Sequence, residues 1–266
     1  MKNLLLLGFV FILAVQCAKV PITGRSQLKL ISNEKVIPMS FQQYEEVKKT
    51  SNVVNTGEQA EMVRRAGNRI QQAVERYFAE LGQSSYLTSY DWEYILIEDD
   101  KTVNAWCMPG GKVAFYTAIL PICKDETGLA VVMGHEIAHA IANHGRERIS
   151  QTVATQTGLG IASVALGGGG ASLTGDMILQ GAGAATQLGI LRFSRKHESE
   201  ADELGLYFMA MAGYDPTEAP KFWERMSAGN ESEPKEFMST HPSHGRRISD
   251  LQKNMPRALE YYRKYN

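Results

Sequence analysis

The sequence predicts an α+β fold that is mainly α-helical and contains a small β-sheet. Three observations favour this class. Apolar residues recur every three or four positions over residues 57–81, which is typical of one face of a packed helix. Residues 89–116 carry short runs rich in aromatic and β-branched residues between turn signals, as strands do. Residues 128–142 and 193–212 return to helical spacing, so helices follow the strands.

The composition indicates a globular protein with a core of its own. The 266 residues are 44% hydrophobic and 21% charged, and the formal net charge is -1. This length fits one domain or two small ones. The sequence holds no basic tract and no internal repeat. We therefore expect neither a nucleic-acid partner nor a repeat architecture.

Residues 1–16 are predicted to be a signal peptide and not part of the fold. Lys2 supplies a positive start, and residues 4–15 form an apolar stretch that is too short to span a membrane. Cys17 follows Ala-Val-Gln, which resembles the end of a bacterial lipoprotein signal, where the cysteine is lipidated and becomes the mature N-terminus. An ordinary cleaved signal is the alternative. We expect export, with a lipid anchor at Cys17 on the periplasmic face of an envelope membrane.

The chain has three cysteines, and an odd number in an exported chain needs an explanation. If Cys17 carries lipid, Cys107 and Cys123 remain. They form either a disulfide or two small buried thiols, and the sequence leaves both readings open.

The N-terminal region is expected to hold a tether and then the first helices. Residues 17–50 are predicted to be a tether and N-terminal segment, with breakers at Pro21, Gly24 and Pro38 and a short helix over 40–49. The main domain is expected to span 51–266. Its first helix, over 57–81, should bury Val63, Ala66, Ile70, Val74, Tyr77 and Leu81.

Three short strands are predicted next, over residues 92–97, 103–107 and 112–116, with a turn at Pro109-Gly110-Gly111. A short helix or turn over 117–122 leads to a longer apolar helix. Asp125 is its expected N-cap. This helix is predicted to run on through Ile149, as far as about residue 156.

Residues 158–189 are rich in glycine and alanine. Asp176, Gln180 and the glycines interrupt any membrane span. We expect two loosely packed helices joined near 167–175, acting as a flap over the active site or as a flexible connection. Gly213 should end the helix over 193–212. Asp215 should cap the next helix, and a polar loop over 229–244 should precede helices near 245–254 and 256–262.

The sequence His135-Glu136-Ile137-Ala138-His139 lies within the apolar helix. Residues four apart share one helix face, about 6 Å from each other, so both imidazoles can bind one zinc ion. Glu136 is rotated by about 100° and can act as a general base without being a ligand. Two satisfied core histidines and an ion-paired glutamate are the structural alternative, but buried polar groups are costly unless they share a ligand.

A catalytic zinc site needs a third protein ligand. Glu198 and Asp202 are four apart on the predicted helix over 193–212. Glu198 is a candidate ligand, and Asp202 a candidate acceptor for the far nitrogen of a ligand histidine. Glu200 is the rival ligand. The alternative is that all three are solvated carboxylates favoured by the helix start.

Several motifs together resemble the M48 family of zinc metallopeptidases, most closely its exported and mitochondrial quality-control members without membrane spans. The resemblance covers roughly residues 50–255. The motifs are His135-Glu136-x-x-His139, Ser194-Arg195-x-x-Glu198-x-x-Ala201-Asp202, Asn104-Ala105-Trp106, Pro109-Gly110-Gly111, and Ser239 to Arg247.

The resemblance implies a zincin-like fold, mainly helical, with a small sheet beside the zinc helix. It implies one Zn²⁺ per chain held by His135, His139 and Glu198, which favours Glu198 over Glu200. It places His241 near the metal, as a latch on the open zinc position or as an oxyanion donor, with Arg247 and Asp202 supporting the site.

Two functions are expected to compete. The first is a zinc endopeptidase that cleaves misfolded or unfolded polypeptides in the bacterial envelope. The alternative is a zinc-stabilised assembly or chaperone-like lipoprotein with little proteolysis. For a peptidase, Asn104, Gly111 and Val113 are candidate substrate-binding residues, since strand 112–116 could pair with a substrate strand. His144 and His197 are read as ordinary surface residues.

Overall fold

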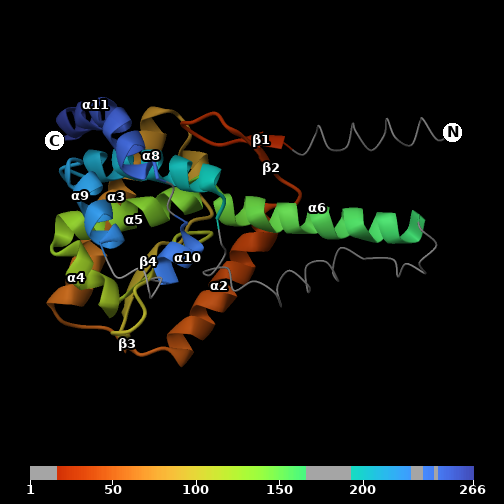
Figure 1. Ribbon diagram of the computed structural model, residues 1–266, viewed down its shortest axis with the longest axis horizontal. Coiled ribbons are helices and arrows are strands. Elements are labelled where there is room, and N and C mark those ends of the chain that lie inside the picture. Colours follow the sequence, from red (N-terminus) through yellow and green to blue (C-terminus); the bar gives the residue numbers. More distant parts are fainter. Residues whose placement is uncertain (1–16, 166–192, 229–235, 243–244) are drawn as a thin grey trace.

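The structure, a computed structural model, describes residues 17–165, 193–228, 236–242 and 245–266 (Figure 1). Helices α5 (Glu126–Ile141) and α8 (Arg195–Met211) pack against each other at the centre. Helix α3 (Glu58–Glu80) packs on both, and α11 (Arg247–Tyr265) packs along α8. The mainly helical fold with a small sheet beside the central helix is therefore confirmed.

The main sheet has four strands in the order β3-β4-β6-β5. They are β3 (Val53–Val54), β4 (Glu93–Ile97), β5 (Ala105–Met108) and β6 (Lys112–Tyr116). The pair β4–β6 is parallel, whereas β3–β4 and β5–β6 are antiparallel. Strand β5 ends the sheet and packs on α5. The three predicted strands are confirmed, and β6 is inserted between the other two.

The N-terminal region differs from the expected tether. Strands β1 (Cys17–Lys19) and β2 (Ser26–Leu28) form an antiparallel hairpin, and its Val20 is buried in the main core. Helix α2 (Asn33–Thr50) begins seven residues before the predicted helix and contains Pro38. Proline in the second turn removes only one backbone hydrogen bond, so the buried apolar face of α2 outweighs it.

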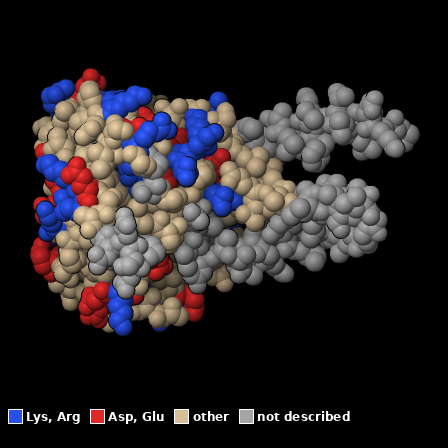
Figure 2. Space-filling view, viewed as in Figure 1, with Lys and Arg blue, Asp and Glu red and all other residues tan. Residues whose placement is uncertain are grey.

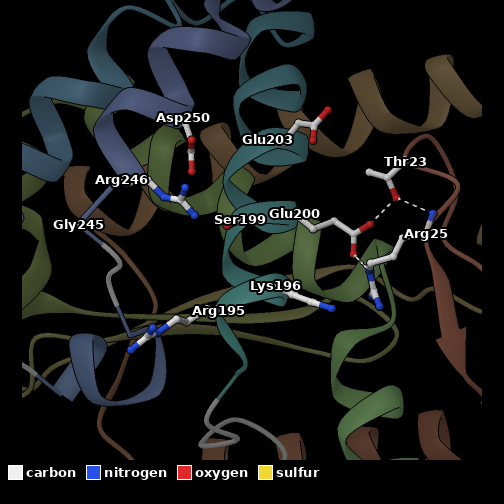
Figure 3. Close-up of a pocket in the computed structure, with 10 residues that line it drawn as sticks. All are labelled: Thr23, Arg25, Arg195, Lys196, Ser199, Glu200, Glu203, Gly245, Arg246 and Asp250. Atoms are coloured by element: carbon white, nitrogen blue, oxygen red, sulfur yellow. Dashed lines mark hydrogen bonds and ion pairs between the residues drawn. The ribbon is translucent and has the colours of Figure 1, made fainter.

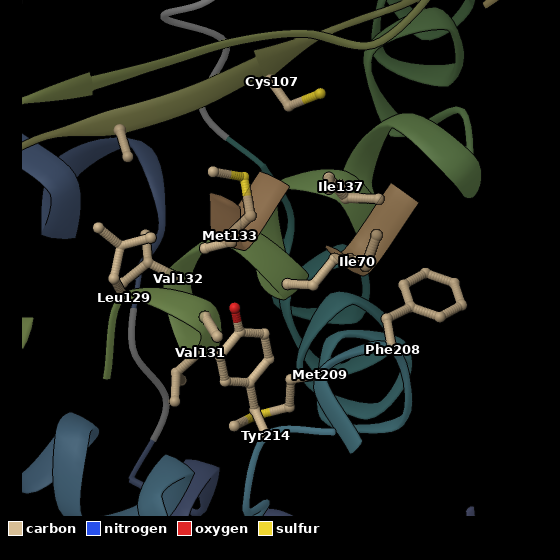
Figure 4. Packing of buried hydrophobic residues seen from close by; sticks show 14 of the residues in the cluster. Ile70, Cys107, Leu129, Val131, Val132, Met133, Ile137, Phe208, Met209 and Tyr214 are labelled. Carbon is tan, nitrogen blue, oxygen red and sulfur yellow. The ribbon is translucent and has the colours of Figure 1, made fainter. Parts of the chain in front are cut away.

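Helix α5 lies in the centre of the core. The Asp125 side chain accepts a hydrogen bond from the N–H of Gly128 at 2.9 Å, which confirms the predicted cap. Every residue from Gly128 to Ile141 is buried. Figure 4 shows side chains of α5, including Met133, among Ile70 of α3 and Phe208 of α8. This all-round burial explains why the helix is apolar on every face except at its histidines and glutamate.

The predicted continuous helix after His139 is wrong. Helix α5 ends at Ile141, and α6 (His144–Ala165) begins after a break. Asn143 lies in the left-handed region with φ +55°, a conformation that asparagine tolerates better than most residues. The break changes the direction of the chain between His139 and His144. In Figure 1, α6 extends away from the body of the molecule.

The C-terminal helices differ in their bounds from those predicted. Gly213, with φ +83°, follows α8 as expected. Helix α9 (Glu218–Ser227) has Thr217 at its N-cap, not the predicted Asp215. The Asp215 side chain accepts the N–H of Thr217 at 2.9 Å, so it stabilises the turn before the helix. A short helix, α10 (Glu236–Thr240), occupies part of the predicted polar loop. A single helix, α11, replaces the two predicted ones. The remaining short helices are η1 (Ser84–Leu87), η2 (Thr117–Ile119) and α4 (Leu120–Cys123).

The other expectations concern cysteines, charge and membrane contact. Cys107 and Cys123 are both buried free thiols, so the disulfide reading is wrong. Figure 2 shows acidic and basic side chains interspersed on the face in view. No helix in the described ranges is long and apolar enough to cross a membrane. The expected signal peptide at 1–16 and the joint near 167–175 lie outside the described residues.

Candidate metal and catalytic site

The helix α5 supplies the first half of the site. His135 and His139 are one turn apart, and their Nε2 atoms lie 3.1 Å from each other. Both rings are buried, with 1% and 2% of each residue exposed. Glu136, next to the first histidine, is equally buried. The predicted common face of the two histidines is therefore present.

Helix α8 supplies an acid to the same point. Glu198 lies in the first turn of α8, which Ser194 caps by accepting the N–H of His197 at 3.3 Å. Its Oε2 lies 3.5 Å from His135 Nε2, and its Oε1 lies 3.5 Å from His139 Nε2. Its side chain has no solvent exposure.

His241 completes the cluster. It follows α10, and its N–H donates to the carbonyl of Phe237 at 2.8 Å. The two rings of this pair stack at 4.5 Å. His241 Nδ1 lies 3.2 Å from His135 Nε2 and 3.3 Å from Glu198 Oε1. One ligand atom from each of the four residues lies within 4.8 Å of all the others.

The donor set fits a metal ion. Three imidazole nitrogens and one carboxylate oxygen are the ligand types that zinc prefers. Glu198 Oε1 is buried and has no hydrogen-bond donor among the described residues. A buried carboxylate atom of this kind is costly unless a cation satisfies it. The crowding of four ligand atoms is therefore explained by a shared ion.

Asp202 and Arg247 support these groups from behind. Asp202 Oδ1 lies 3.0 Å from His135 Nδ1, the nitrogen that faces away from the cluster. Arg247 donates from Nε to Asp202 Oδ2 at 2.7 Å and from its terminal nitrogen to Glu198 Oε2 at 2.6 Å. Its guanidinium lies 3.9 Å above the ring of Trp223. Arg247 thus holds two carboxylates in place and is itself fixed by an aromatic ring.

The pKa values of these groups reflect burial and close charges. Burial lowers the pKa of His135, but Asp202 and Glu198 outweigh burial and raise it to about 9. Burial dominates at His139 and lowers its pKa well below the usual value. At Glu198 the neighbouring histidines outweigh burial, and its pKa is well below the usual range. The carboxylate is therefore ionised and available to a cation.

Glu136 has a different environment. Burial raises its pKa, and His241 and His135 offset this only in part. The backbone N–H of Cys107 on β5 donates to its carboxylate. His241 Nε2 lies 3.5 Å from Glu136 Oε1 on the other side. A buried carboxylate with a raised pKa is a stronger base than an exposed one, and this carboxylate lies beside four potential metal ligands, where a general base is needed.

The candidate substrate-binding residues lie in and beside the strand pair β5–β6. Val113 is on β6, whose two edges are paired with β4 and β5, so an added strand cannot pair there and this part of the expectation is wrong. Gly111 lies in the β5–β6 turn with φ +90°, against Trp92. Asn104 lies just before the outer strand, and its Oδ1 accepts the N–H of Ala105 at 2.9 Å.

The reading of His144 and His197 as surface residues is also wrong. Only 0% and 2% of these residues are exposed. His144 Nδ1 lies 2.9 Å from Nδ1 of His139, on the side away from the cluster. An uninterrupted helix would have turned His144 away from His139, and the break at Asn143 brings it back. An asparagine between two helical stretches is the only signal in the sequence for this change of direction.

Two glycines bring the helices close enough for these contacts. A Cβ on Gly205 of α8 would lie 2.7 Å from the backbone nitrogen of His135. A Cβ on Gly134 of α5 would lie 2.7 Å from the carbonyl oxygen of Gly205. The two backbones therefore touch at this crossing, one residue from the first histidine. Side chains at either position would separate α5 from α8.

Fold and site together define a class of protein. A central helix carries H-E-x-x-H, a second helix contributes an acid, and the outer strand of a small sheet contacts the glutamate. This is the zincin-like metallopeptidase fold. The family model for peptidase family M48 matches residues 65–255, and the chain belongs to that family.

Curated relatives include three informative proteins. The mitochondrial metalloendopeptidase OMA1 of Schizosaccharomyces pombe is 39% identical over 70% of this chain and 53% of its own length. The Saccharomyces cerevisiae protein of the same name is 36% identical over 67% and 51%. The β-barrel assembly-enhancing protease of Escherichia coli is 31% identical over 60% and 33%. The chain thus spans about half, or less, of the length of these relatives.

Proposed function

We propose that this protein is a zinc-dependent metalloendopeptidase that cleaves misfolded or unfolded polypeptides at the bacterial cell envelope. The observation that carries the proposal is the buried cluster of His135, His139, Glu198 and His241 beside Glu136. The relatives named above as metalloendopeptidases support the same reaction class. These relatives are longer than the present chain, so their substrates and partners are not assigned to it.

His135, His139 and Glu198 would hold the zinc ion. Bound zinc supplies a Lewis acid that activates water and polarises the peptide carbonyl. Asp202 Oδ1, 3.0 Å from His135 Nδ1, orients the His135 ring. Arg247 donates to both Glu198 and Asp202 and holds the two carboxylates in place. These outer partners keep the ligand atoms converged, which outer partners do generally in zinc sites.

Glu136 would move the protons. Its buried, raised-pKa carboxylate takes a proton from the attacking water and passes it to the leaving amine. The hydrogen bond from Cys107 fixes the carboxylate beside β5. The His241 ring lies between Glu136, 3.5 Å from its Nε2, and Glu198, 3.3 Å from its Nδ1, where a donor can stabilise charge that develops on the carbonyl oxygen.

The outer strand β5 is the place where an extended substrate would bind. The N–H of Tyr116 donates to the carbonyl of Asn104 at 3.1 Å, so Asn104 and Trp106 face β6. Backbone groups alternate along an antiparallel strand, and those of Ala105 and Cys107 face the other edge. A substrate strand on that edge would run past Glu136, and it would replace the contacts that the N–H groups of Ala105 and Cys107 make with Asn104 and Glu136. Pairing through backbone groups tolerates many sequences, as unfolded substrates require.

The location is inferred from the N-terminal sequence. An apolar stretch over residues 4–15 followed by Cys17 favours export and a lipid anchor. Mass spectrometry of the protein extracted from membranes tests this, with a lipid on an N-terminal Cys17 as the expected result. A soluble protein with an unmodified N-terminus would leave simple export.

The central experiment compares wild type with Glu136→Gln. Both proteins are assayed for zinc content and for cleavage of unfolded casein and of a folded protein. We expect one zinc per chain in both, with cleavage of casein only by wild type and at least about 10²-fold loss in the variant. A variant that turns over casein like wild type contradicts the enzyme proposal. A chain whose cellular role survives Glu136→Gln is an assembly factor instead.

A further inference from the structure

A second cluster of buried polar groups lies behind His139, away from the four converging ligand atoms. It joins three parts of the chain: the turn of the N-terminal hairpin, α6 and α8. The side chains of its two carboxylates and two imidazoles are between 0% and 6% exposed. Its members are Thr23, Arg25, His144, Glu147, His197 and Glu200.

One arm of this cluster runs from the proposed ligand to the hairpin. His139 Nδ1 lies 2.9 Å from His144 Nδ1, and His144 Nε2 lies 2.9 Å from Glu200 Oε2. Arg25 Nε donates to the same Glu200 oxygen at 2.6 Å. The hydroxyl of Thr23 donates to the other oxygen of Glu200. Figure 3 shows Thr23 and Arg25 reaching Glu200 on α8.

The arm has a defined direction. When the Nε2 atom of His139 faces His135 and Glu198, its Nδ1 atom carries the hydrogen and donates it to His144 Nδ1. His144 then carries its hydrogen on Nε2 and donates to Glu200. The Glu200 carboxylate accepts, and Arg25 neutralises it. Each contact therefore fixes the tautomer of the ring before it.

A second arm steadies the first. Arg25 donates from its two terminal nitrogens to Glu147 at 3.1 and 2.7 Å. Glu147 Oε2 lies 3.1 Å from His197 Nε2. The His197 ring stacks on the His144 ring, with centroids 4.4 Å apart and an angle of 19°. One guanidinium thus restrains both His144 and the ring that covers it.

We propose that Arg25 is a positioning residue for the metal site: through Glu200 and His144 it fixes the ring of His139, so the N-terminal hairpin is part of the site. This assignment rests on the proposed zinc site, since the ring that Arg25 fixes belongs to His139, one of the proposed zinc ligands. Partners of ligand histidines are usually carboxylates or carbonyls. Here a neutral histidine stands between the ligand and the carboxylate, and the cation lies on a separate element.

The test measures zinc affinity in the full chain by competition with a chelator. Arg25→Ala is expected to raise the zinc dissociation constant by about 10-fold, the low end of the effect of removing a direct outer partner, since Arg25 acts through Glu200 and His144. It should also shift the visible absorption of the cobalt-substituted protein, which reports ligand geometry. The matched control is Arg195→Ala. Arg195 and Arg25 both line the pocket drawn in Figure 3, and in the described part of the chain no hydrogen bond or ion pair joins Arg195 to Glu200 or Glu147.

A double-mutant cycle shows whether Arg25 acts through His144. We expect Arg25→Ala and His144→Ala together to weaken zinc binding by less than the product of their separate factors. Arg25→Lys keeps the charge but cannot span Glu200 and Glu147 as a guanidinium does, so it should fall between wild type and Arg25→Ala. It also serves as the test variant if Arg25→Ala does not fold.

The outcomes separate this inference from the function on which it rests. Wild type that binds no zinc contradicts the proposed function. Wild type that binds zinc, with Arg25→Lys and folded Arg25→Ala that bind it equally tightly and give the same cobalt spectrum, contradicts only the role of Arg25. Independent, multiplicative effects of Arg25 and His144 would likewise overturn the positioning role.

Discussion

Glu198 and Glu200 are two residues apart on α8, and their side chains have different neighbours. Glu198 lies 3.5 Å from both His135 and His139, whereas Glu200 is bound by Arg25 and His144. Only Glu198 has an oxygen that converges with the histidine nitrogens. The site therefore favours Glu198 as the third ligand, because Glu200 is already satisfied by a cation and an imidazole.

The first prediction separates these two acids. Glu198→Ala should lose zinc almost completely, since a ligand is removed from a three-ligand site. Glu200→Ala should bind zinc more weakly, by about 10-fold, the low end of the effect of a direct outer partner, because His144 stands between Glu200 and the ligand His139. Metal analysis after dialysis checks both. Full zinc in Glu198→Ala together with its complete loss in Glu200→Ala would reverse the assignment.

The second prediction concerns His241, which contacts both halves of the site. Its Nδ1 faces Glu198 and its Nε2 faces Glu136. If His241 donates to the developing oxyanion, His241→Ala should lower kcat on small peptides by about 10²–10³-fold while zinc is retained. A pure latch on the metal predicts the opposite, a rise in activity. His241→Gln, which keeps a donor, should recover part of the loss.

At the scale of elements, the distance between α5 and α8 is set where Gly134 and Gly205 touch. The ligand histidines lie on one helix and Glu198 on the other, so this distance decides whether their atoms converge. The third prediction is that Gly205→Ala lowers the free energy of unfolding by about 1–3 kcal/mol, as overpacking does, and weakens zinc binding. Urea unfolding and chelator competition measure the two effects.

The matched control for that substitution is Gly145→Ala. A Cβ on Gly145 of α6 would meet Pro109 Cγ at 3.4 Å, an ordinary contact. Alanine there should leave stability equal or slightly higher, because it restricts the unfolded chain. If Gly145→Ala and Gly205→Ala behave alike, the helix contact does not control the site.

The fourth prediction concerns the ion pairs that join the hairpin to α6 and α8. Burial raises the pKa of Glu147, but hydrogen bonds from His197 and Arg25 outweigh it and lower the pKa to about 2. A depressed carboxylate pKa stabilises the fold above the ordinary value near 4.5. That stability is lost as the pH falls from about 4.5 through 2. The full contribution at neutral pH is at most about 3 kcal/mol.

Thermal unfolding of wild type and Glu147→Gln checks this. The variant should be less stable at pH 7, and the difference should shrink as the pH falls below about 4.5. Glu46→Gln, on the exposed surface of α2, is the control and should show no such difference. A difference in Tm between wild type and Glu147→Gln that stays constant down to pH 2 would contradict the assigned ion pair.

At the scale of the whole molecule, the sequence predicted what depends on local spacing. Helix periodicity located α3, α5 and α8, and the four-residue spacings placed His135 with His139 and Glu198 with Asp202. Strand order could not be read in this way, because β6 pairs with β4 across a crossover, and this moved Val113 to the middle of the sheet. The role of Arg25 could not be predicted, because a polar segment with Pro21 and Gly24 is typical of a tether and gives no sign of the helices it packs against.

The break between α5 and α6 had the largest consequence. A helix rotates by about 100° per residue, so one left-handed residue redirects every side chain after it. A continuous helix therefore places His144 on the surface, while the break turns it behind His139. His197 lies on α8, and it is buried because Glu147 and the His144 ring of the redirected α6 lie against it. Long-range contacts such as Arg25 to Glu200 depend on such turns and leave no periodic signal.

The last prediction concerns the stability of the whole chain without metal. The three proposed ligands converge from α5 and α8, with His241 beside them, so an ion bound there links the two central helices of the fold. An ion that binds only the folded state adds about 2.7 kcal/mol when its concentration is 100 times its dissociation constant. Removing it should lower the Tm by about 5–11 °C for a domain of this size.

Circular dichroism after dialysis against a chelator measures this effect. The helix signal should persist, because the core around α5 is apolar and does not need the ion. Added zinc should restore the Tm, and magnesium should not, since magnesium prefers oxygen ligands. Glu198→Ala provides the control: its Tm should not respond to zinc. An identical Tm for wild type with and without chelator would mean that the cluster does not bind an ion that stabilises the fold.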